Sequence, residues 1–329
     1  MNRQSTASSL PAPVLPHVWE PASAQEAITL KRQYGADSAY VAGSTLLRTQ
    51  WEGGLLTIPA HMIRLDTIEG LNGIMEDEQQ IRIGALTTLR ECGHDHRLRI
   101  HGNTCSTACR HIAAPAVRNL GTIGGNISSA VGDMIPALLV HDARLVWMDT
   151  EHHPSEYEQE LVDWLEQVRV GRRSLYAVLL GIVIDKSGPD TAPDLHNHQN
   201  SAPFHTSLSS EPSWREISFY RKVGRREAFT PSLVTVAFRA LMNREGVLVN
   251  VKAAAGGGAG LAMRLSRCEQ LLEGKVYDPR YTAELAALVE KEWVSYSDPF
   301  ASESYRRQTA GNLLAAGLWE TLHQEMERG

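Results

Sequence analysis

The chain has 329 residues, of which 43% are hydrophobic and 21% are charged, and its formal net charge at pH 7 is -6. A chain of this length exceeds one ordinary hydrophobic core, so we expect two or three domains. The negative charge and the lack of a long Lys or Arg run argue against a nucleic-acid-binding surface. No apolar run approaches the ~20 residues that would span a bilayer.

The cysteines and the N-terminal sequence limit the cellular location and the metal sites that can be expected. Four cysteines do not make a disulfide framework, and the proline-broken N-terminus does not resemble a signal peptide, so a cytoplasmic location is expected. Cys105 and Cys109 are spaced CxxxC near several histidines, but the paired CxxC spacing of structural zinc is absent. Buried free thiols and surface histidines are therefore favoured over a metal site.

The N-terminal part predicts a flexible lead followed by a helix and a strand. Residues 1–18 are rich in Ser, Pro and Ala. A capping box at 23–26 predicts a helix that ends near Gly35, and 39–42 predicts a short strand. This strand runs into Gly43-Ser44-Thr45-Leu46 and then into a predicted helix, and bare backbone N–H groups at such a junction could meet phosphate.

The next elements are strands and short helices that lead to a glycine-rich stretch. Strands are predicted at 61–66 and 80–85, and Thr87 or Thr88 could cap a short helix that reaches Cys92. A further helix is predicted from 104 to 117, with Pro115 bringing it to an end.

The stretch Val117–Asn126 carries three glycines within five residues, Gly121, Gly124 and Gly125. Without Cβ atoms, their backbone can approach a ligand closely. Taken alone, such a segment is more often a tight turn. A second Gly/Ser/Thr-rich loop lies about 80 residues earlier, however, and two such loops suit a ligand with two phosphates.

The middle of the chain predicts strands at 143–148 and 176–184, with a helical pattern from 161 to 168 between them. Residues 187–213 are polar and contain little to bury, so they are predicted to form a long surface loop or insertion.

The C-terminal part predicts a strand at 214–220 and paired strands at 233–241 and 247–254. A basic patch at 221–226 is either a solvated strand end or a set of cations near an anionic ligand. Ala255–Gly260 could be a dinucleotide loop, but no acidic residue follows at the required place, so a strand-to-helix turn is favoured. The chain is predicted to end in three helices, at 264–272, 279–291 and 302–326.

Several motifs together resemble the FAD-binding subunits of the molybdenum hydroxylases, the group that includes xanthine dehydrogenase FAD subunits and carbon monoxide dehydrogenase medium subunits. The most specific is VRNLGTIGGN, which is nearly letter-for-letter the second flavin loop of that family. The resemblance covers about residues 18 to 323 without the loop 187–213, and it is carried by the segments 41–46, 83–88, 117–126, 220–226, 251–258, 268–275 and 305–307.

This resemblance implies an α+β fold with an FAD-binding domain of the PCMH, or vanillyl-alcohol-oxidase, type. Two α+β subdomains, 19–78 and 79–213, would hold FAD, and a C-terminal α+β domain of the CO dehydrogenase flavoprotein type, 214–329, would follow.

The resemblance also implies the cofactor contacts. Asp133 would lie near the ribose or ring side, and Arg221 or Lys222 would lie near the isoalloxazine, where a cation can stabilise reduced, anionic flavin. Replacing Gly124 by a bulky residue is expected to strip FAD and leave the fold largely intact. The diphosphate would be held by the backbones of Val41, Ala42, Gly43, Ser44, Thr45 and Leu46 and of Thr122, Ile123, Gly124, Gly125 and Asn126.

Three positions depart from the family pattern. Ser44 replaces a glycine that many relatives have, the spacing from Asn126 to Asp133 is about two residues shorter than in xanthine dehydrogenases, and Ala228-Phe229-Thr230 occupies the place of an acidic residue. The first departure restricts how closely the backbone can approach the cofactor. The other two concern the contacts at the ribose and at the ring edge of the flavin.

The implied function is an electron-transferring oxidoreductase subunit. A molybdopterin-binding large subunit would hydroxylate a heterocyclic or aldehyde substrate, and electrons would pass through [2Fe–2S] clusters on a small subunit to FAD, then to NAD⁺ or another acceptor. Four cysteines without cluster spacing place the clusters on the partner. The complex could be a dimer of heterotrimers. Alternatives are a structural adaptor with weakened flavin binding and a stand-alone flavin reductase or oxidase.

Overall fold

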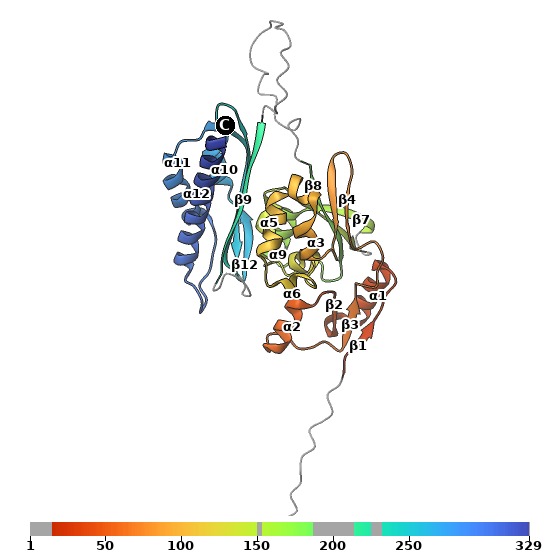
Figure 1. The fold of residues 1–329 in the computed structure, drawn as a ribbon. Helices are drawn as coiled ribbons and strands as arrows, with labels where there is room; N and C mark the ends of the chain where they lie inside the picture. Colours follow the sequence, from red (N-terminus) through yellow and green to blue (C-terminus); the bar gives the residue numbers. More distant parts are fainter. Residues whose placement is uncertain (1–14, 150–152, 187–213, 225–231, 329) are drawn as a thin grey trace, which may run out of the picture.

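The computed structural model describes residues 15–149, 153–186, 214–224 and 232–328. Three sheets follow one another along the chain, and they form the N-terminal, central and C-terminal parts in Figure 1. The predicted α+β fold class is confirmed by the mixture of sheets and helices in all three parts. The predicted loop 187–213, Arg225, Arg226 and Ala228-Phe229-Thr230 lie outside the described residues.

The N-terminal part is a small parallel sheet of order β1-β3-β2 with helices around it. The Ser23 side chain caps α1 by accepting from the Glu26 N–H, and Gly35 ends this helix with φ 51°. Its elements are β1 (His17–Trp19), α1 (Ala24–Tyr34), η1 (Gly35–Asp37), β2 (Ser38–Val41), α2 (Thr45–Glu52) and β3 (His61–Arg64).

The central part is an antiparallel sheet of order β4-β5-β8-β6-β7 that is covered by helices. Its strands are β4 (Ile74–Glu76), β5 (Gln80–Gly84), β6 (Arg144–Asp149), β7 (His153–Glu160) and β8 (Val178–Asp185). Its helices are α3 (Leu89–His94), α4 (His96–His101), α5 (Asn103–His111), α6 (Pro115–Arg118), α7 (Ile123–Ser128), α8 (Ile135–Leu139) and α9 (Leu161–Arg169).

Strand β8 explains why the central sheet carries the most apolar strand of the chain. Ile182 and Ile184 pack into the core formed with the helices, whereas Val178, Leu180 and Val183 pack toward α1 and the N-terminal part. A strand that is buried on both faces needs apolar residues at successive positions rather than alternation.

The C-terminal part is an antiparallel sheet of order β12-β11-β10-β9, with β13 paired to β11. The helices α11 and α12 cover the face away from the rest of the molecule (Figure 1), and the other face adds Tyr220, Ala237, Ala254 and Ala262 to the central core. The elements are β9 (Trp214–Gly224), β10 (Ser232–Asn243), β11 (Val247–Gly257), β12 (Gly260–Arg264), α10 (Ser266–Leu272), β13 (Lys275–Val276), α11 (Arg280–Glu292) and α12 (Glu303–Arg328).

Several sequence predictions were wrong in detail. Pro115 begins α6 at its first turn instead of ending a helix, since α5 already ends at His111. The segment 255–260 ends β11, makes the hairpin turn and begins β12, so it leads into a strand and not into a helix. Strands β1 and β7 were not predicted, and β4 pairs with β5 although it lies within the range 19–78.

Candidate functional site

The first predicted loop presents a row of unused backbone N–H groups. β2 ends at Val41, and Ser44 adopts a left-handed conformation (φ 51°, ψ 15°) as the residue before α2, without a side-chain cap. Within the described part of the chain, the N–H groups from Gly43 to Leu47 have no hydrogen-bond acceptor. Consecutive free amides at a helix N-terminus are able to bind an anionic group.

The second predicted loop is a capped helix start, and most of its N–H groups are engaged. Thr122 is the N-cap of α7, and its Oγ1 accepts from the Gly125 N–H at 3.0 Å. The Ile123 N–H donates to Thr87 O at 2.9 Å, and the Gly124 N–H donates to Ala85 O at 2.8 Å. These three amides are therefore held by the protein itself in this conformation. The Thr122 N–H has no acceptor among the described residues, and Gly125 is exposed.

Gly124 serves close packing. A Cβ atom at this position would lie 2.6 Å from Ala85 O and 2.8 Å from Ala85 Cβ. The residue is buried, so the neighbouring backbone leaves no room for a side chain. The expectation that a bulky residue at 124 would leave the fold largely intact is therefore not supported by the packing.

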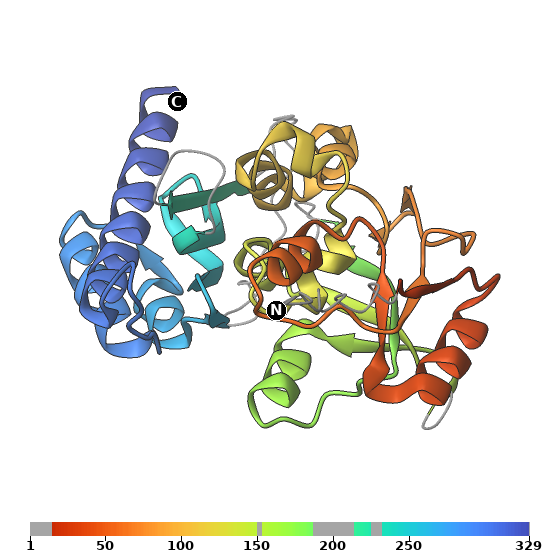
Figure 2. The same ribbon diagram turned by 90° about the horizontal axis from the view of Figure 1, so that it is seen from below.

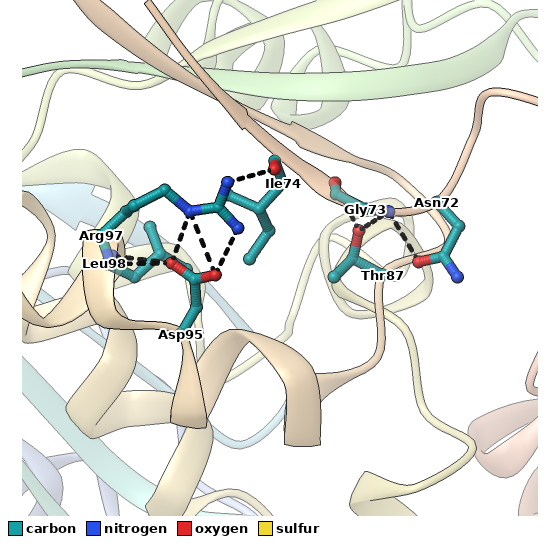
Figure 3. Close-up of polar contacts among 7 residues, drawn as sticks. All are labelled: Asn72, Gly73, Ile74, Thr87, Asp95, Arg97 and Leu98. Atoms are coloured by element: carbon teal, nitrogen blue, oxygen red, sulfur yellow. Dashed lines mark hydrogen bonds and ion pairs between the residues drawn. The ribbon is translucent and has the colours of Figure 1, made fainter.

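The segment that holds the second loop is itself fixed by the turn before β4. Thr87 Oγ1 accepts from the Gly73 N–H at 2.9 Å and donates to Gly73 O at 3.0 Å (Figure 3). Arg97 donates to Ile74 O at 2.6 Å and is held by Asp95 in the same view. The turn before β4 therefore holds Thr87, whose carbonyl accepts from the Ile123 N–H at the start of α7.

The two loops touch each other. A Cβ atom on Gly43 would lie 1.7 Å from Leu120 O, and one on Gly121 would lie 3.3 Å from Thr45 Oγ1. The approach brings α2 directly beneath α6 in Figure 1, and the same helix lies over the central part in Figure 2. The two loops therefore pack directly against each other, and only glycine fits at 43.

Asp133 is brought to the junction of the central and C-terminal parts. Its Oδ2 accepts from Lys222 Nζ at 2.7 Å, its Oδ1 accepts from the Ser232 hydroxyl, and its backbone carbonyl accepts from the Tyr220 hydroxyl at 3.1 Å. The side chains of Asp133 and Lys222 are 11% and 9% exposed. The pair is therefore partly buried, and each carboxylate oxygen keeps a second acceptor position for a ligand hydroxyl.

Burial has a clear effect on Tyr220, which lies beneath this pair. Desolvation and the nearby Asp133 raise the pKa of Tyr220 well above its ordinary value. Its hydroxyl therefore stays protonated and remains a hydrogen-bond donor to the Asp133 backbone. Ser232 and Tyr220 were missed as partners of Asp133, since contacts across 99 and 87 residues leave no local pattern in the sequence.

Asn126 shapes the turn that carries Asp133. Its Oδ1 accepts from the Met134 N–H at 3.1 Å, and a Cβ atom on Gly132 would lie 2.0 Å from the same oxygen. The short spacing between Asn126 and Asp133 is therefore accommodated by a tight turn around the Asn126 amide.

Arg221 and Lys222 point to opposite faces of β9. Arg221 pairs with Glu320 of α12 at 2.7 Å, and both side chains are more than 40% exposed. Lys222 instead faces the central part, where it also donates to His111 O at 3.4 Å. Of the two predicted cations, only Lys222 lies with the other candidate residues.

The fold is that of a class of flavoproteins with an FAD-binding domain followed by a second α+β domain. A family model described as "FAD binding domain in molybdopterin dehydrogenase" matches residues 13–184, and one described as "CO dehydrogenase flavoprotein C-terminal domain" matches residues 218–321. The chain belongs to this family of FAD-binding oxidoreductase subunits.

Curated relatives support this assignment. The nicotinate dehydrogenase FAD-subunit of Eubacterium barkeri is 29% identical over 54% of this chain and 58% of that protein. The carbon monoxide dehydrogenase medium chain of Hydrogenophaga pseudoflava is 33% identical over 36% and 42%. The nicotine 6-hydroxylase medium subunit of Paenarthrobacter nicotinovorans is 25% identical over 91% and 95%. The chain thus spans about half the length of the first two relatives.

Solved structures share the fold. A carbon monoxide dehydrogenase chain from Hydrogenophaga pseudoflava matches with a TM-score of 0.76 at 20% identity, over 93% of this chain and 98% of that chain. Quinoline 2-oxidoreductase from Pseudomonas putida 86 matches with a TM-score of 0.75 at 20% identity, over 95% and 98%. In the described residues, none of the helices combines the length and apolarity that crossing a membrane requires. The predicted buried free thiols are confirmed for all four cysteines.

Proposed function

We propose that this chain is the electron-transferring FAD subunit of a molybdenum-containing hydroxylase. The observation that carries the proposal is the open amide row from Gly43 to Leu47, which touches the second family loop at Leu120. Consecutive free amides of this kind are suited to binding the oxygens of a diphosphate. When bound, FAD supplies the electron-transfer chemistry, and the protein supplies binding, orientation and electrostatics.

Different residues would contact different parts of the FAD cofactor. The amides of Gly43 to Leu47, with the Thr122 N–H and the exposed edge at Gly125, would hold the diphosphate. Asp133 would accept from a ribityl or ribose hydroxyl, and Lys222 would place its charge toward the ring. Because Asp133 partners Lys222, the pair contributes no net charge.

The partners would be a molybdopterin-binding large subunit and a small subunit with [2Fe–2S] clusters. Support comes from relatives that are named medium chains or FAD subunits of dehydrogenases and hydroxylases. Electrons would leave through NAD⁺ or another acceptor. The substrate would bind on the large subunit, and the relatives act on substrates as different as nicotinate and carbon monoxide by name.

A second candidate is an adaptor subunit of the same fold with weakened flavin binding. The engaged amides of Ile123, Gly124 and Gly125 favour it, since they leave fewer donors for a diphosphate. The FAD-to-protein ratio of the purified full-length chain separates the two candidates. A ratio near one supports the flavoprotein, and an FAD-free chain that reconstitution does not load supports the adaptor.

The charge pair offers a sharper test. Lys222→Met leaves Asp133 as an uncompensated anion, so we expect the reduction potential of bound FAD to fall. Asp133→Asn leaves the cation, so the potential should rise. Arg221→Met, on the opposite face of β9, is the matched control and should leave the potential unchanged. Equal potentials in all three variants would place the flavin ring away from this pair.

A further inference from the structure

A β-bulge at the start of β10 lies beside the contact between Ser232 and Asp133. Ser232 and Val234 are opposite two consecutive residues of β9, so Leu233, which lies between them, is an extra residue on β10. Bulges of this kind redirect side chains and recur beside functional sites. Here the residue before the bulge donates its hydroxyl hydrogen to the Asp133 carboxylate. The conformation of the bulge therefore decides whether Asp133 keeps this donor.

The guanidinium of Arg306, in α12, holds the bulge. Its Nη1 donates to Leu233 O at 2.5 Å, and its Nη2 pairs with Asp298 at 2.6 Å. Its Cζ lies 4.5 Å from the centre of the Tyr296 ring. A guanidinium presents its N–H groups in a rigid plane, so these contacts together fix the position of the Leu233 carbonyl. Arg306 therefore ties the last helix to the residue that follows Ser232.

Two glycines of the hairpin between β11 and β12 leave room for this contact. A Cβ atom on Gly258 would lie 2.8 Å from Arg306 Nη1, and one on Gly257 would lie 2.9 Å from Leu233 O. Their φ angles, 126° for Gly257 and 65° for Gly258, also disfavour residues with a Cβ atom. The glycine-rich segment 255–260 therefore allows close packing around a buried cation.

Arg306 is fully buried, which is energetically unfavourable for a cation. Its side chain is 0% exposed, and its Nε has no hydrogen-bond partner among the described residues. Replacing a buried ion pair by apolar residues is often neutral or even stabilising, because the pair must be removed from water. The contribution of Arg306 is therefore expected in the arrangement of the groups that it binds, foremost the carbonyl next to Ser232.

We propose that Arg306 is a positioning residue for the flavin site, an inference that rests on the proposed binding of FAD at Asp133. The guanidinium holds Leu233, and the bulge in turn holds the Ser232 hydroxyl against the carboxylate. Without this donor, the carboxylate loses its fixed orientation toward a ribityl or ribose hydroxyl, which weakens FAD binding. Its negative charge is also less compensated, which lowers the reduction potential of bound FAD.

The test compares the full-length parent chain with Ser232→Ala, Arg306→Met and the double variant by FAD titration, below the unfolding temperatures that circular dichroism gives. Each single variant should bind FAD about tenfold more weakly, because a hydrogen bond to a charged group is lost or misplaced. The double variant should also lose only about tenfold, because Arg306 acts through Ser232. Arg307→Met is the matched control, since Arg307 pairs with Glu303 of the same helix at 2.6 Å, and it should bind FAD as the parent does.

The reduction potential of bound FAD is the second readout, which a loss of stability alone does not move. It should fall in Ser232→Ala and in Arg306→Met, and it should fall no further in the double variant. Arg307→Met should leave it unchanged.

Asp298→Asn tests the same link if Arg306→Met does not fold. The Asn Oδ1 still accepts from the N–H groups of Phe300 and Ala301, whereas Arg306 loses its anionic partner. FAD binding should weaken in this variant and should weaken no further than in Ser232→Ala when the two changes are combined.

Parental FAD affinity in Ser232→Ala, or in the folded Arg306 or Asp298 variant, would overturn the proposal. Losses that multiply to about 100-fold in the double variant would do the same, because they would show independent effects. A parent chain that binds no FAD would contradict the proposed function itself, so the two failures are distinguishable.

Discussion

The two glycine-containing loops of the proposed cofactor site differ in how their backbone N–H groups are used. In the first loop, the N–H groups of Gly43 to Leu47 have no acceptor in the described part of the chain. In the second loop, Ile123 and Gly124 donate to Thr87 and Ala85, and Gly125 donates to the Thr122 cap. A glycine-rich motif can thus serve either ligand approach or close packing, and only the hydrogen-bond partners tell which.

The largest effect is expected from a substitution that disrupts the packing of the second loop. Gly124→Val should lower the free energy of unfolding by about 3 kcal/mol, because the new side chain meets the Ala85 backbone in a buried place. Thermal or denaturant unfolding monitored by circular dichroism measures the loss. Gly125→Ala is the matched control, since its Cβ meets only the Thr122 hydroxyl at 3.0 Å. A Gly124→Val variant with full stability but low FAD occupancy would show that Gly124 serves FAD binding and not packing.

The contact between the loops is tested at Gly43. Gly43→Ala should weaken FAD binding by about 100-fold, because the Leu120 carbonyl must move away and the two loops separate. Fluorescence titration of the FAD-free chain with FAD measures the affinity. Leu120→Ala keeps the same carbonyl and removes only a side chain that is 60% exposed, so it should bind nearly as the parent does. Equal affinities in both variants would show that the contact does not matter.

A smaller effect is expected at the cap of α7. Thr122→Ala should cost about 1 kcal/mol of stability, because the Gly125 N–H loses its acceptor. FAD affinity should change little if the Thr122 backbone, and not its hydroxyl, faces the diphosphate. Thr122→Ser retains the cap and should restore the stability. A large loss of FAD in Thr122→Ala that Thr122→Ser restores would assign the hydroxyl to the cofactor.

The smallest effect has the opposite sign. Ser44→Gly should raise the free energy of unfolding by about 0.5–1 kcal/mol. The left-handed backbone at φ 51° costs a residue with a Cβ atom about 1–2 kcal/mol, and the greater chain entropy of unfolded glycine offsets about 0.5–1 kcal/mol of that gain. Ser128→Gly makes the same substitution within α7, where it should lower the free energy of unfolding by a similar amount. A destabilised Ser44→Gly would mean that the Ser44 hydroxyl, which donates to Ala42 O at 3.1 Å, holds the loop.

Local signals gave much of the fold. The cap at Ser23, the helix end at Gly35 and the apolar run of β8 were predicted correctly. Thr88 caps α3, and its own backbone N–H donates to the Glu91 carboxylate in return. Strand β7 was missed because it is an edge strand with charged residues, paired on one side only. Hairpin β11–β12 was missed because its glycines resemble those of a strand-to-helix turn.

Less of the candidate site than of the fold could be predicted from the sequence. The first loop and the meeting of the two loops were predicted, as was Lys222 as one of two candidate cations. The occupied amides of the second loop depend on Ala85 and Thr87, more than 30 residues earlier. The choice of Lys222 over Arg221 depends on the alternation of β9 against α12. Contacts with residues that are distant in the chain leave no local pattern in the sequence.

The environment of Asp133 has a consequence for how the protein is made. Its side-chain partners, Lys222 and Ser232, lie 89 and 99 residues later in the chain. On the ribosome, the cofactor domain therefore emerges with this carboxylate unpaired, and its partners follow only with the first strands of the last domain. We expect a nascent chain stopped near residue 190 to retain FAD poorly, so that cofactor loading is a late event in synthesis.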